Sequence, residues 1–156
     1  MADLRSIFGV LDFTDIYTCL QSGNVVFSSN SKPDASVITK AIKDTLGLDV
    51  PVLTLPGSEL TKAAKRNPFL NVESGTPAFC YLTFLWETHP KTMVDNLTVP
   101  EIETGRFSVS GNFVYVYCPD GYGRTKINNQ FFEKKLQVTA TTRNWNTVSA
   151  LMDLIS

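Results

Sequence analysis

The chain has 156 residues, which is the usual size of one domain or of two very small ones that share a core. Its 43% hydrophobic and 19% charged residues are ordinary for a globular protein and exclude a disordered chain. Fifteen acidic residues against 14 basic ones give a net charge of -1, which excludes a global field that attracts nucleic acid or an anionic membrane.

Two further features indicate a cytoplasmic protein. No run approaches the roughly 20 apolar residues of a membrane span, so no membrane partner is expected. The three cysteines, Cys19, Cys80 and Cys118, are an odd number, widely spaced and set among apolar residues. That pattern is typical of buried free thiols in a reducing compartment.

The first half begins with a helix, because apolar residues at 4, 7, 8 and 11 share one helical face. Strands over 16–20 and 24–28 follow, joined by a Gly-containing hairpin connection. A second helix over 38–46 stops at Gly47. Residues 50–55 predict an edge strand, because Pro51 cannot donate to a ladder. A short helix over 58–66 comes next, and residues 71–77 are the candidate boundary between the halves.

The second half begins with the most apolar strand, over 78–86, and a helix around 91–97. Residues 107–109 and 113–118 predict a hairpin around a turn at 110–112. A loop over 119–125 then leads to a helix that starts near Lys126. The last helix carries the apolar residues Val148, Leu151, Met152 and Ile155 at helical spacing.

These elements predict an α+β fold of two ferredoxin-like, or split βαβ, halves over residues 1–73 and 74–156. The first half lacks an opening strand and the second lacks a closing one. An opening strand is central in such a sheet, so we expect the first half to be the less stable one.

The strongest local chemistry lies in residues 121–126, where a Gly-containing loop leads into a helix. The free N–H groups and the dipole of a helix start favour an anion, and Arg124 and Lys126 add charge. The spacing is not that of a P-loop, so ATP hydrolysis is not implied. A plain strand-to-helix turn with Thr125 as the helix cap is the alternative. It leaves Tyr122, Arg124 and Lys126 unexplained.

A second set of polar residues lies just before the last helix. Arg143, Asn144 and Asn146 flank Trp145 and could hold a phosphate or a base. In the alternative, Asn144 or Asn146 caps the helix and Trp145 belongs to the core. Residues 105–156 carry six basic and three acidic residues, a balance of +3, so an anion would be drawn to this part of the chain.

Other candidate sites are not favoured by the pattern. Aromatic residues alternate along 113–117, but a strand buried on both faces explains them better than a base-stacking surface. His89 is the only histidine, and no metal-ligand set accompanies it. No catalytic residues, metal site or cofactor can be read from the chain.

The hairpin 17–27 and the segments 118–126, 129–136 and 141–148 resemble a largely bacterial family called domain of unknown function 1697. That family typically has a strand and a Gly-rich turn before its first helix, a segment that this chain lacks. The resemblance implies ferredoxin-like halves but no activity.

The leading hypothesis is a binding protein for a phosphorylated or otherwise anionic small molecule in the cleft between the halves. The expected contacts are Tyr122, Gly123, Arg124, Lys126, Arg143, Asn144 and Asn146, with the two arginines converging on one site. General nucleic-acid binding is not expected, because only the last third of the chain is positive. The alternatives are an enzyme that acts on such a ligand through Tyr122 or Asp120, and a homo-oligomeric or partner-binding protein without a small-molecule site.

Overall fold

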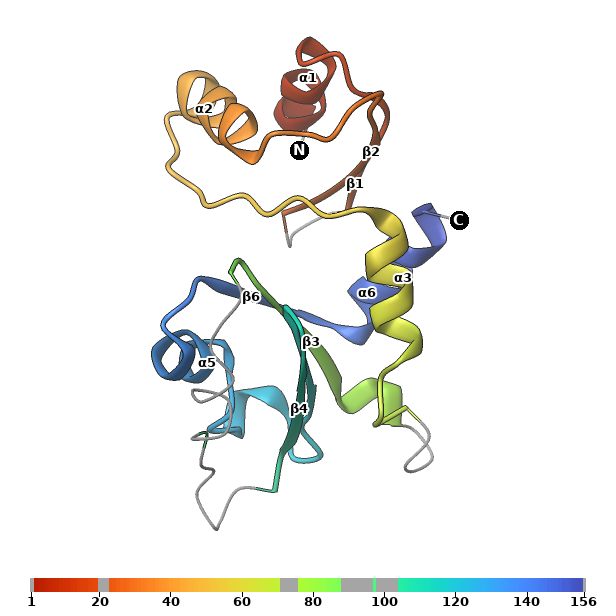
Figure 1. Cartoon of the computed structure of the whole chain (residues 1–156), viewed down its shortest axis with the longest axis vertical. Coiled ribbons are helices and arrows are strands. Elements are labelled where there is room, and N and C mark those ends of the chain that lie inside the picture. Colours follow the sequence, from red (N-terminus) through yellow and green to blue (C-terminus); the bar gives the residue numbers. More distant parts are fainter. Residues whose placement is uncertain (1, 20–22, 71–75, 88–96, 98–103, 156) are drawn as a thin grey trace. The chain divides into compact units, whose positions relative to one another are not determined.

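The computed structural model describes residues 2–19, 23–70, 76–87, 97 and 104–155. Its fold is a mixed α+β arrangement, which confirms the predicted class. The described part contains five α-helices, two short 3-10 helices and two small antiparallel sheets (Figure 1).

The chain forms two compact units. The first consists of Met1–Thr61 and Ala150–Ser156, and the second of Lys62–Ser149. The division falls inside two helices, so the first unit joins the two ends of the chain and the second is the continuous segment between them. The expected division at residue 73 stays a prediction.

The first unit contains a hairpin and two helices of its own. Helix α1 (Ala2–Val10) is followed by β1 (Thr14–Cys19) and β2 (Asn24–Ser28), and then by α2 (Ala35–Leu46). The two strands pair only with each other among the described residues, with an irregularity between Thr14 and Tyr17. These elements confirm the predicted helices and hairpin.

The ends of α2 follow directly from the sequence. Asp34 caps its first turn by accepting a hydrogen bond from the Ser36 N–H at 2.9 Å. Gly47 ends the helix with φ 69°, a left-handed conformation that glycine adopts without strain, and its N–H donates to the Lys43 carbonyl. The predicted stop at Gly47 is therefore confirmed.

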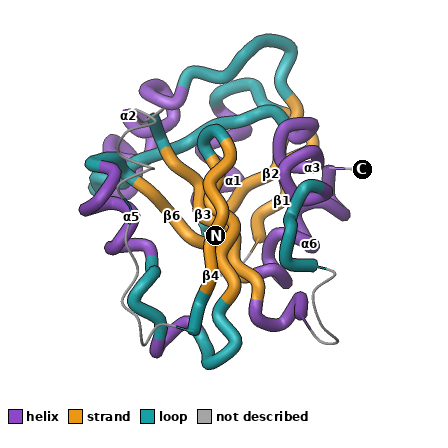
Figure 2. Tube along the Cα trace, turned by 60° about the horizontal axis from the view of Figure 1, so that its bottom comes forward, coloured by secondary structure: helices purple, strands orange, loops and turns teal. Residues whose placement is uncertain are grey.

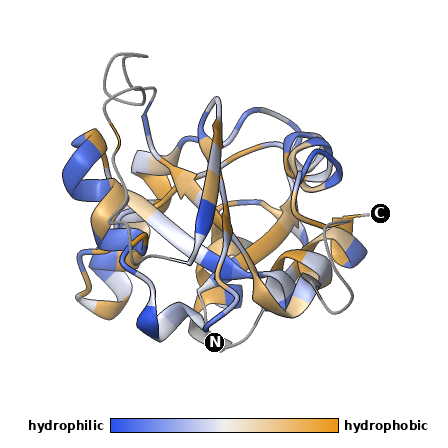
Figure 3. Cartoon of the chain, turned by 90° about the horizontal axis from the view of Figure 1, so that it is seen from below, coloured by the Kyte–Doolittle hydropathy of each residue, from blue (hydrophilic) through white to orange (hydrophobic). Residues whose placement is uncertain are grey.

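The core of the first unit is built from the inner faces of these elements. Four buried residues, Ile7, Phe8, Ile38 and Ile42, form its centre. Phe8, Phe13 and Phe27 pack as three rings with centroids 4.4–5.6 Å apart. The helices carry both hydrophilic and hydrophobic colours (Figure 3), as amphipathic helices must when one side faces a core.

The predicted strand at residues 50–55 is wrong. These residues form no strand in the structure, and helix α3 (Gly57–Lys65) follows them. Pro51 lacks the N–H that a ladder needs, and Pro56 stands just before α3. The apolar pattern of this segment therefore gives an extended connection.

The second unit is built on a four-stranded antiparallel sheet in the order β4-β5-β3-β6. Strands β3, β4 and β6 of this sheet are labelled in Figure 2. Its strands are β3 (Cys80–Leu85), β4 (Arg106–Ser110), β5 (Phe113–Tyr117) and β6 (Ala140–Asn144). A 3-10 turn, η1 (Thr76–Phe79), precedes β3. The turn η2 (Tyr122–Arg124) and helix α5 (Asn129–Leu136) connect β5 to β6, and α6 (Trp145–Ile155) ends the chain. The predicted helix at 91–97 lies outside the described residues, apart from Leu97.

Strand β6 corrects the expected element order. The second half was expected to lack a closing strand, but Ala140–Asn144 pairs antiparallel with β3 along its whole length. Its sequence, Ala-Thr-Thr-Arg-Asn, has no apolar alternation, so periodicity gave no sign of it.

The two faces of this sheet have different partners. Val114, Val116 and Leu85 pack with Ile127, Phe132 and Leu136 on the face that α5 covers. Tyr115 points to the other face, where its hydroxyl donates to the Ala63 carbonyl at 2.7 Å. Strand β5 is therefore buried on both faces, as the sequence predicted, and its aromatic side chains are not a base-stacking surface.

Candidate functional site

The segment after β5 makes a compact turn that satisfies most of its own backbone groups. Gly121 has φ 93°, a conformation that other residues rarely adopt, so the backbone itself requires glycine there. The N–H groups of Gly121, Arg124 and Thr125 donate to carbonyls within the segment or at Cys118. The Ile127 N–H donates to the Thr125 hydroxyl at 3.2 Å.

Tyr122 holds this turn against the sheet and the helix. Its hydroxyl accepts a hydrogen bond from the Asn129 N–H at 2.6 Å, and its ring packs against Tyr81 with centroids 4.6 Å apart. Burial, together with the neighbouring Cys118 and Tyr122, raises the pKa of Tyr81. Tyr122 thus acts inside the fold as a side-chain cap on α5.

Helix α5 begins later than expected. It starts at Asn129 with Asn128 as its cap, not near Lys126 as predicted. The Asn128 side chain accepts from the Phe131 N–H at 3.0 Å, and Tyr122 already accepts from Asn129. Two donors that an anion would use at this helix start are therefore occupied.

Gly123, Arg124 and Lys126 lie on the surface of the second unit, and all three are exposed. A Cβ added at Gly123 would meet nothing within 4 Å, and Gly123 does not have a positive φ. Among the described residues, the Arg124 side chain makes no hydrogen bond or ion pair. Among the predicted ligand contacts in residues 121–126, these three are the exposed ones.

Arg143 lies on the opposite face of the sheet from Tyr122. The neighbouring Thr142 points toward α5, where its hydroxyl bonds Asn129, and successive residues of a strand alternate between faces. The Arg143 guanidinium donates to the Thr141 hydroxyl at 2.5 Å and to the Thr142 carbonyl at 3.0 Å. The register therefore does not bring Arg143 together with the turn at Tyr122.

Asn144 and Asn146 are exposed near the start of α6. Asn144 accepts a hydrogen bond from the Thr147 N–H at 2.9 Å, so it caps the helix as the alternative interpretation proposed. Trp145 is buried, which also agrees with that interpretation. Asn146 has only its position and exposure to connect it with a ligand.

A polar network that no sequence pattern indicated joins α5 to two strands. The Asn129 amide donates to the Glu133 carboxylate at 3.2 Å and to the Ala140 carbonyl at 2.9 Å, and its oxygen accepts from Thr142 at 2.9 Å. Because Thr142 donates to that oxygen, it accepts from Thr83 in the 2.7 Å contact between the two hydroxyls. Glu133 also accepts from the Ala140 N–H at 3.1 Å.

That network explains several polar residues of the C-terminal part without any ligand. The side chain of Thr83 is fully buried, and its hydroxyl is hydrogen-bonded to Thr142. The only signal of this network in the sequence was the presence of two polar residues, Asn129 and Thr142, in segments that are otherwise part of the fold. It could not be interpreted without knowing that β6 exists.

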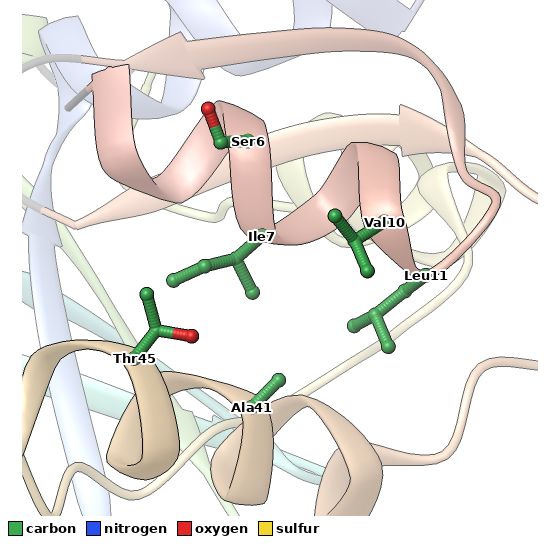
Figure 4. Close-up of a pocket in the computed structure, with 6 residues that line it drawn as sticks. All are labelled: Ser6, Ile7, Val10, Leu11, Ala41 and Thr45. Carbon is green, nitrogen blue, oxygen red and sulfur yellow. The ribbon is translucent and has the colours of Figure 1, made fainter.

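The first unit contains a pocket of a different kind. It lies between α1 and α2, has a volume of about 150 Å³, and is lined by Ser6, Ile7, Val10, Leu11, Ala41 and Thr45. Figure 4 shows Ile7 and Leu11 directed toward α2, and Ala41 and Thr45 directed toward α1. Its lining is almost wholly apolar and offers no charged group to an anion.

The remaining candidate residues carry no site in the described part of the chain. Cys80 and Cys118 are buried and form no disulfide within the described residues, and burial raises the pKa of the Cys80 thiol. The residues that the structure describes contain no group of three His, Cys, Asp or Glu suited to a metal ion, and His89 lies outside them. No described helix is both long and apolar enough to cross a membrane.

Residues 1–115 match the family model described as Protein of unknown function (DUF1697). The chain belongs to this family. The match ends before the turn at Tyr122. The resemblance of residues 118–148 to the C-terminal part of this family therefore stays a prediction. Neither a curated protein nor a solved structure matches the chain.

Proposed function

We propose that this DUF1697 chain is a small cytoplasmic binding protein that takes a phosphorylated or otherwise anionic ligand at Gly123, Arg124 and Lys126. Tyr122 is the residue that positions this turn. The ligand contacts lie within the second unit, on the surface next to the α5 side of the sheet.

The observation that carries the proposal is the exposed pair Gly123 and Arg124. Glycine is favoured where the backbone needs a positive φ, where a side chain would clash, or where a ligand approaches the backbone closely. Gly123 has neither of the first two reasons within the described structure. A phosphate beside the exposed Arg124 guanidinium supplies the third, because guanidinium pairs well with planar and tetrahedral oxyanions.

The charge of the surrounding sequence supports the same ligand class. Residues 105–156 have a balance of +3. Of their three acidic residues, Glu133 uses both carboxylate oxygens within the fold, and Asp120 accepts from the Thr104 hydroxyl. The positive charge at Arg124 and Lys126 is solvent-facing.

The test is a titration with inorganic phosphate and with a nucleoside diphosphate, followed by amide chemical shifts and by urea unfolding. At a ligand concentration 100 times Kd, binding should add about 2.7 kcal/mol to the free energy of unfolding. Arg124→Ala should abolish this gain. Lys134→Ala removes the same charge from an exposed position on α5 and should keep most of it.

Gly123→Ala provides a control that leaves the charge unchanged. Because a Cβ there meets nothing within 4 Å, the free protein should keep its stability while the ligand affinity falls. Equal losses in the Arg124 and Lys134 variants would show nonspecific charge attraction and would contradict the proposal. Shifts confined to the α1–α2 pocket would also contradict it.

General nucleic-acid binding should be weak, because the net charge is -1 and phosphate contacts dominate such affinity. Arg143, Asn144 and Asn146 stay a prediction that the site at Gly123 does not need. Tight, salt-sensitive retention on single-stranded RNA would favour a larger site that includes them.

The second unit is also proposed to be a ferredoxin-like half. The support is the strand order β4-β5-β3-β6 with every pair antiparallel, which is the order of a split βαβ sheet when β3 is its first strand and β6 its last. A ferredoxin-like first half without its opening strand is the corresponding proposal for the β1–β2 hairpin.

A further inference from the structure

The outer side of α1 carries an apolar residue that its own chain does not bury. The Val10 side chain is 82% exposed, although it stands on the rim of the pocket between α1 and α2. The floor of that pocket includes Ile7, Leu11 and Ala41 (Figure 4). An exposed apolar residue beside an apolar hollow is the arrangement that a partner surface covers.

Gly9, next to Val10, has no explanation within the described structure. It lies inside α1, its φ is not positive, and a Cβ would meet nothing within 4 Å. Glycine weakens a helix compared with alanine, so the position has a cost that the described fold does not offset. A second helix that packs closely against α1 requires a small residue at this level.

Charges of both signs flank the same surface. Arg5 is exposed one turn before Gly9, and Asp12 is exposed just after the helix. Within the described part of the chain, neither side chain forms an ion pair or hydrogen bond. A surface with one cation and one anion on either side of an apolar centre is complementary to a copy of itself.

We propose that this surface, made of Arg5, Ser6, Gly9, Val10 and Asp12 with the α1–α2 pocket, is a homodimer interface in which α1 packs antiparallel against α1 of a second copy. A two-fold axis level with Phe8 and Gly9 places residues equally far from that level opposite one another. Arg5 then faces Asp12 of the other copy, and Val10 faces Ile7 in the pocket of the other copy.

The charges favour a second copy over other occupants. A small apolar ligand would fill the pocket but leave Arg5 and Asp12 without partners. A contact made by one short helix and the rim of another belongs to the smallest class of interfaces, so the dimer should be weak and depend on concentration.

The experiment is sedimentation velocity of the full chain over roughly 1 µM to about 1 mM, the range in which such weak complexes form. The wild type should pass from monomer to dimer. Val10→Lys should raise the dissociation constant at least about tenfold. Leu154→Lys, at an exposed position on α6, is the matched control and should leave the dissociation constant unchanged.

A charge exchange separates pairing from a simple loss of charge. Arg5→Glu should weaken the dimer, and the double variant with Arg5→Glu and Asp12→Arg should restore it, because the pair is present again with reversed sign. Both residues are exposed, and circular dichroism checks that each variant folds. A wild type that stays monomeric throughout the range, a dimer that Val10→Lys leaves intact, or a charge exchange without rescue would each overturn the proposal.

Discussion

Asn129 joins three elements through one side chain. Its amide bonds the Ala140 carbonyl and the Thr142 hydroxyl on β6, and Thr142 continues to Thr83 on β3. Both donor and acceptor ends of the amide meet suitable partners, so its orientation is determined by the network. A partly buried polar network of this kind fixes which helix packs on which strand.

We expect Asn129→Ala to lower the free energy of unfolding by about 1–3 kcal/mol, because the Ala140 carbonyl loses its side-chain donor and the Thr142 hydroxyl loses its acceptor. Urea unfolding measures the change. The neighbouring Gln130→Ala, at an exposed position of the same helix turn, should change it by less than about 0.5 kcal/mol. Equal effects would mean that helix propensity, and not the network, sets the loss.

The buried thiols allow a second prediction for single residues. Cys80 and Cys118 are almost fully buried, and burial raises the pKa of Cys80, so little thiolate is present to react. In a Cys19→Ser variant, a thiol reagent should label the native protein very slowly and both cysteines promptly in urea. Rapid labelling of the native variant would show that the sheet opens around β3 or β5.

At the scale of elements, α2 has a pH-dependent cap. Hydrogen bonds from the Ser36 hydroxyl and N–H hold the pKa of the Asp34 carboxyl below its usual value of 3.8. The unfolded chain then binds a proton more readily, so the stabilisation is complete above the unfolded pKa and is lost as the pH falls through the folded one.

We therefore expect the stability difference between the wild type and Asp34→Asn to shrink as the pH falls below 3.8, because asparagine still caps the helix but does not titrate in this range. Urea unfolding at a series of acidic pH values measures it. Ser36→Ala removes one of the two donors and should move the midpoint of this change toward 3.8. A difference that stays constant with pH would mean that the charge of Asp34 contributes nothing to the cap.

Elements with their own local signal could be predicted from the sequence, and those that depend on a distant partner could not. The helix ending at Gly47 and the hairpin around Gly111 carry their stop and turn residues within a few positions. Strand β6 is recognisable only beside β3, because its Thr142 is satisfied by Thr83 and Asn129 and not by apolar burial. Residues 50–55 have the opposite problem, since they have the apolar pattern of a strand but form none.

The same limit applies to the candidate site. Exposure of Arg124 and Lys126 agrees with their position in a polar loop. The role of Tyr122 inside the fold could not be predicted. Its hydroxyl accepts from the N–H of Asn129, the first residue of α5, whereas the sequence predicted that this helix starts near Lys126. The position of Arg143 across the sheet follows from strand alternation, which the sequence did not reveal for this segment.

At the scale of the whole molecule, the two sheets differ in how completely their strands are paired. Strand β5 lies between β3 and β4 and is buried on both faces. Strands β1 and β2 pair only with each other among the described residues, and two-stranded sheets have little stability of their own. The core around Phe8 and Ile38 must therefore hold the hairpin in place.

We expect native-state hydrogen exchange to report this difference directly. The best-protected amides of β5 should approach the global free energy of unfolding, whereas those of β1 and β2 should exchange through local opening, about tenfold faster or more. The comparison is best made between valines, because intrinsic exchange rates differ less within one residue type. Val114 and Val116 represent β5, and Val25 and Val26 represent β2. This difference in amide protection should be the same at protein concentrations above and below the dissociation constant of the proposed dimer, because the proposed interface uses α1 and not a strand edge. Equal protection of the two sheets would mean that a further strand completes the β1–β2 sheet, and that the first half does not lack its opening strand.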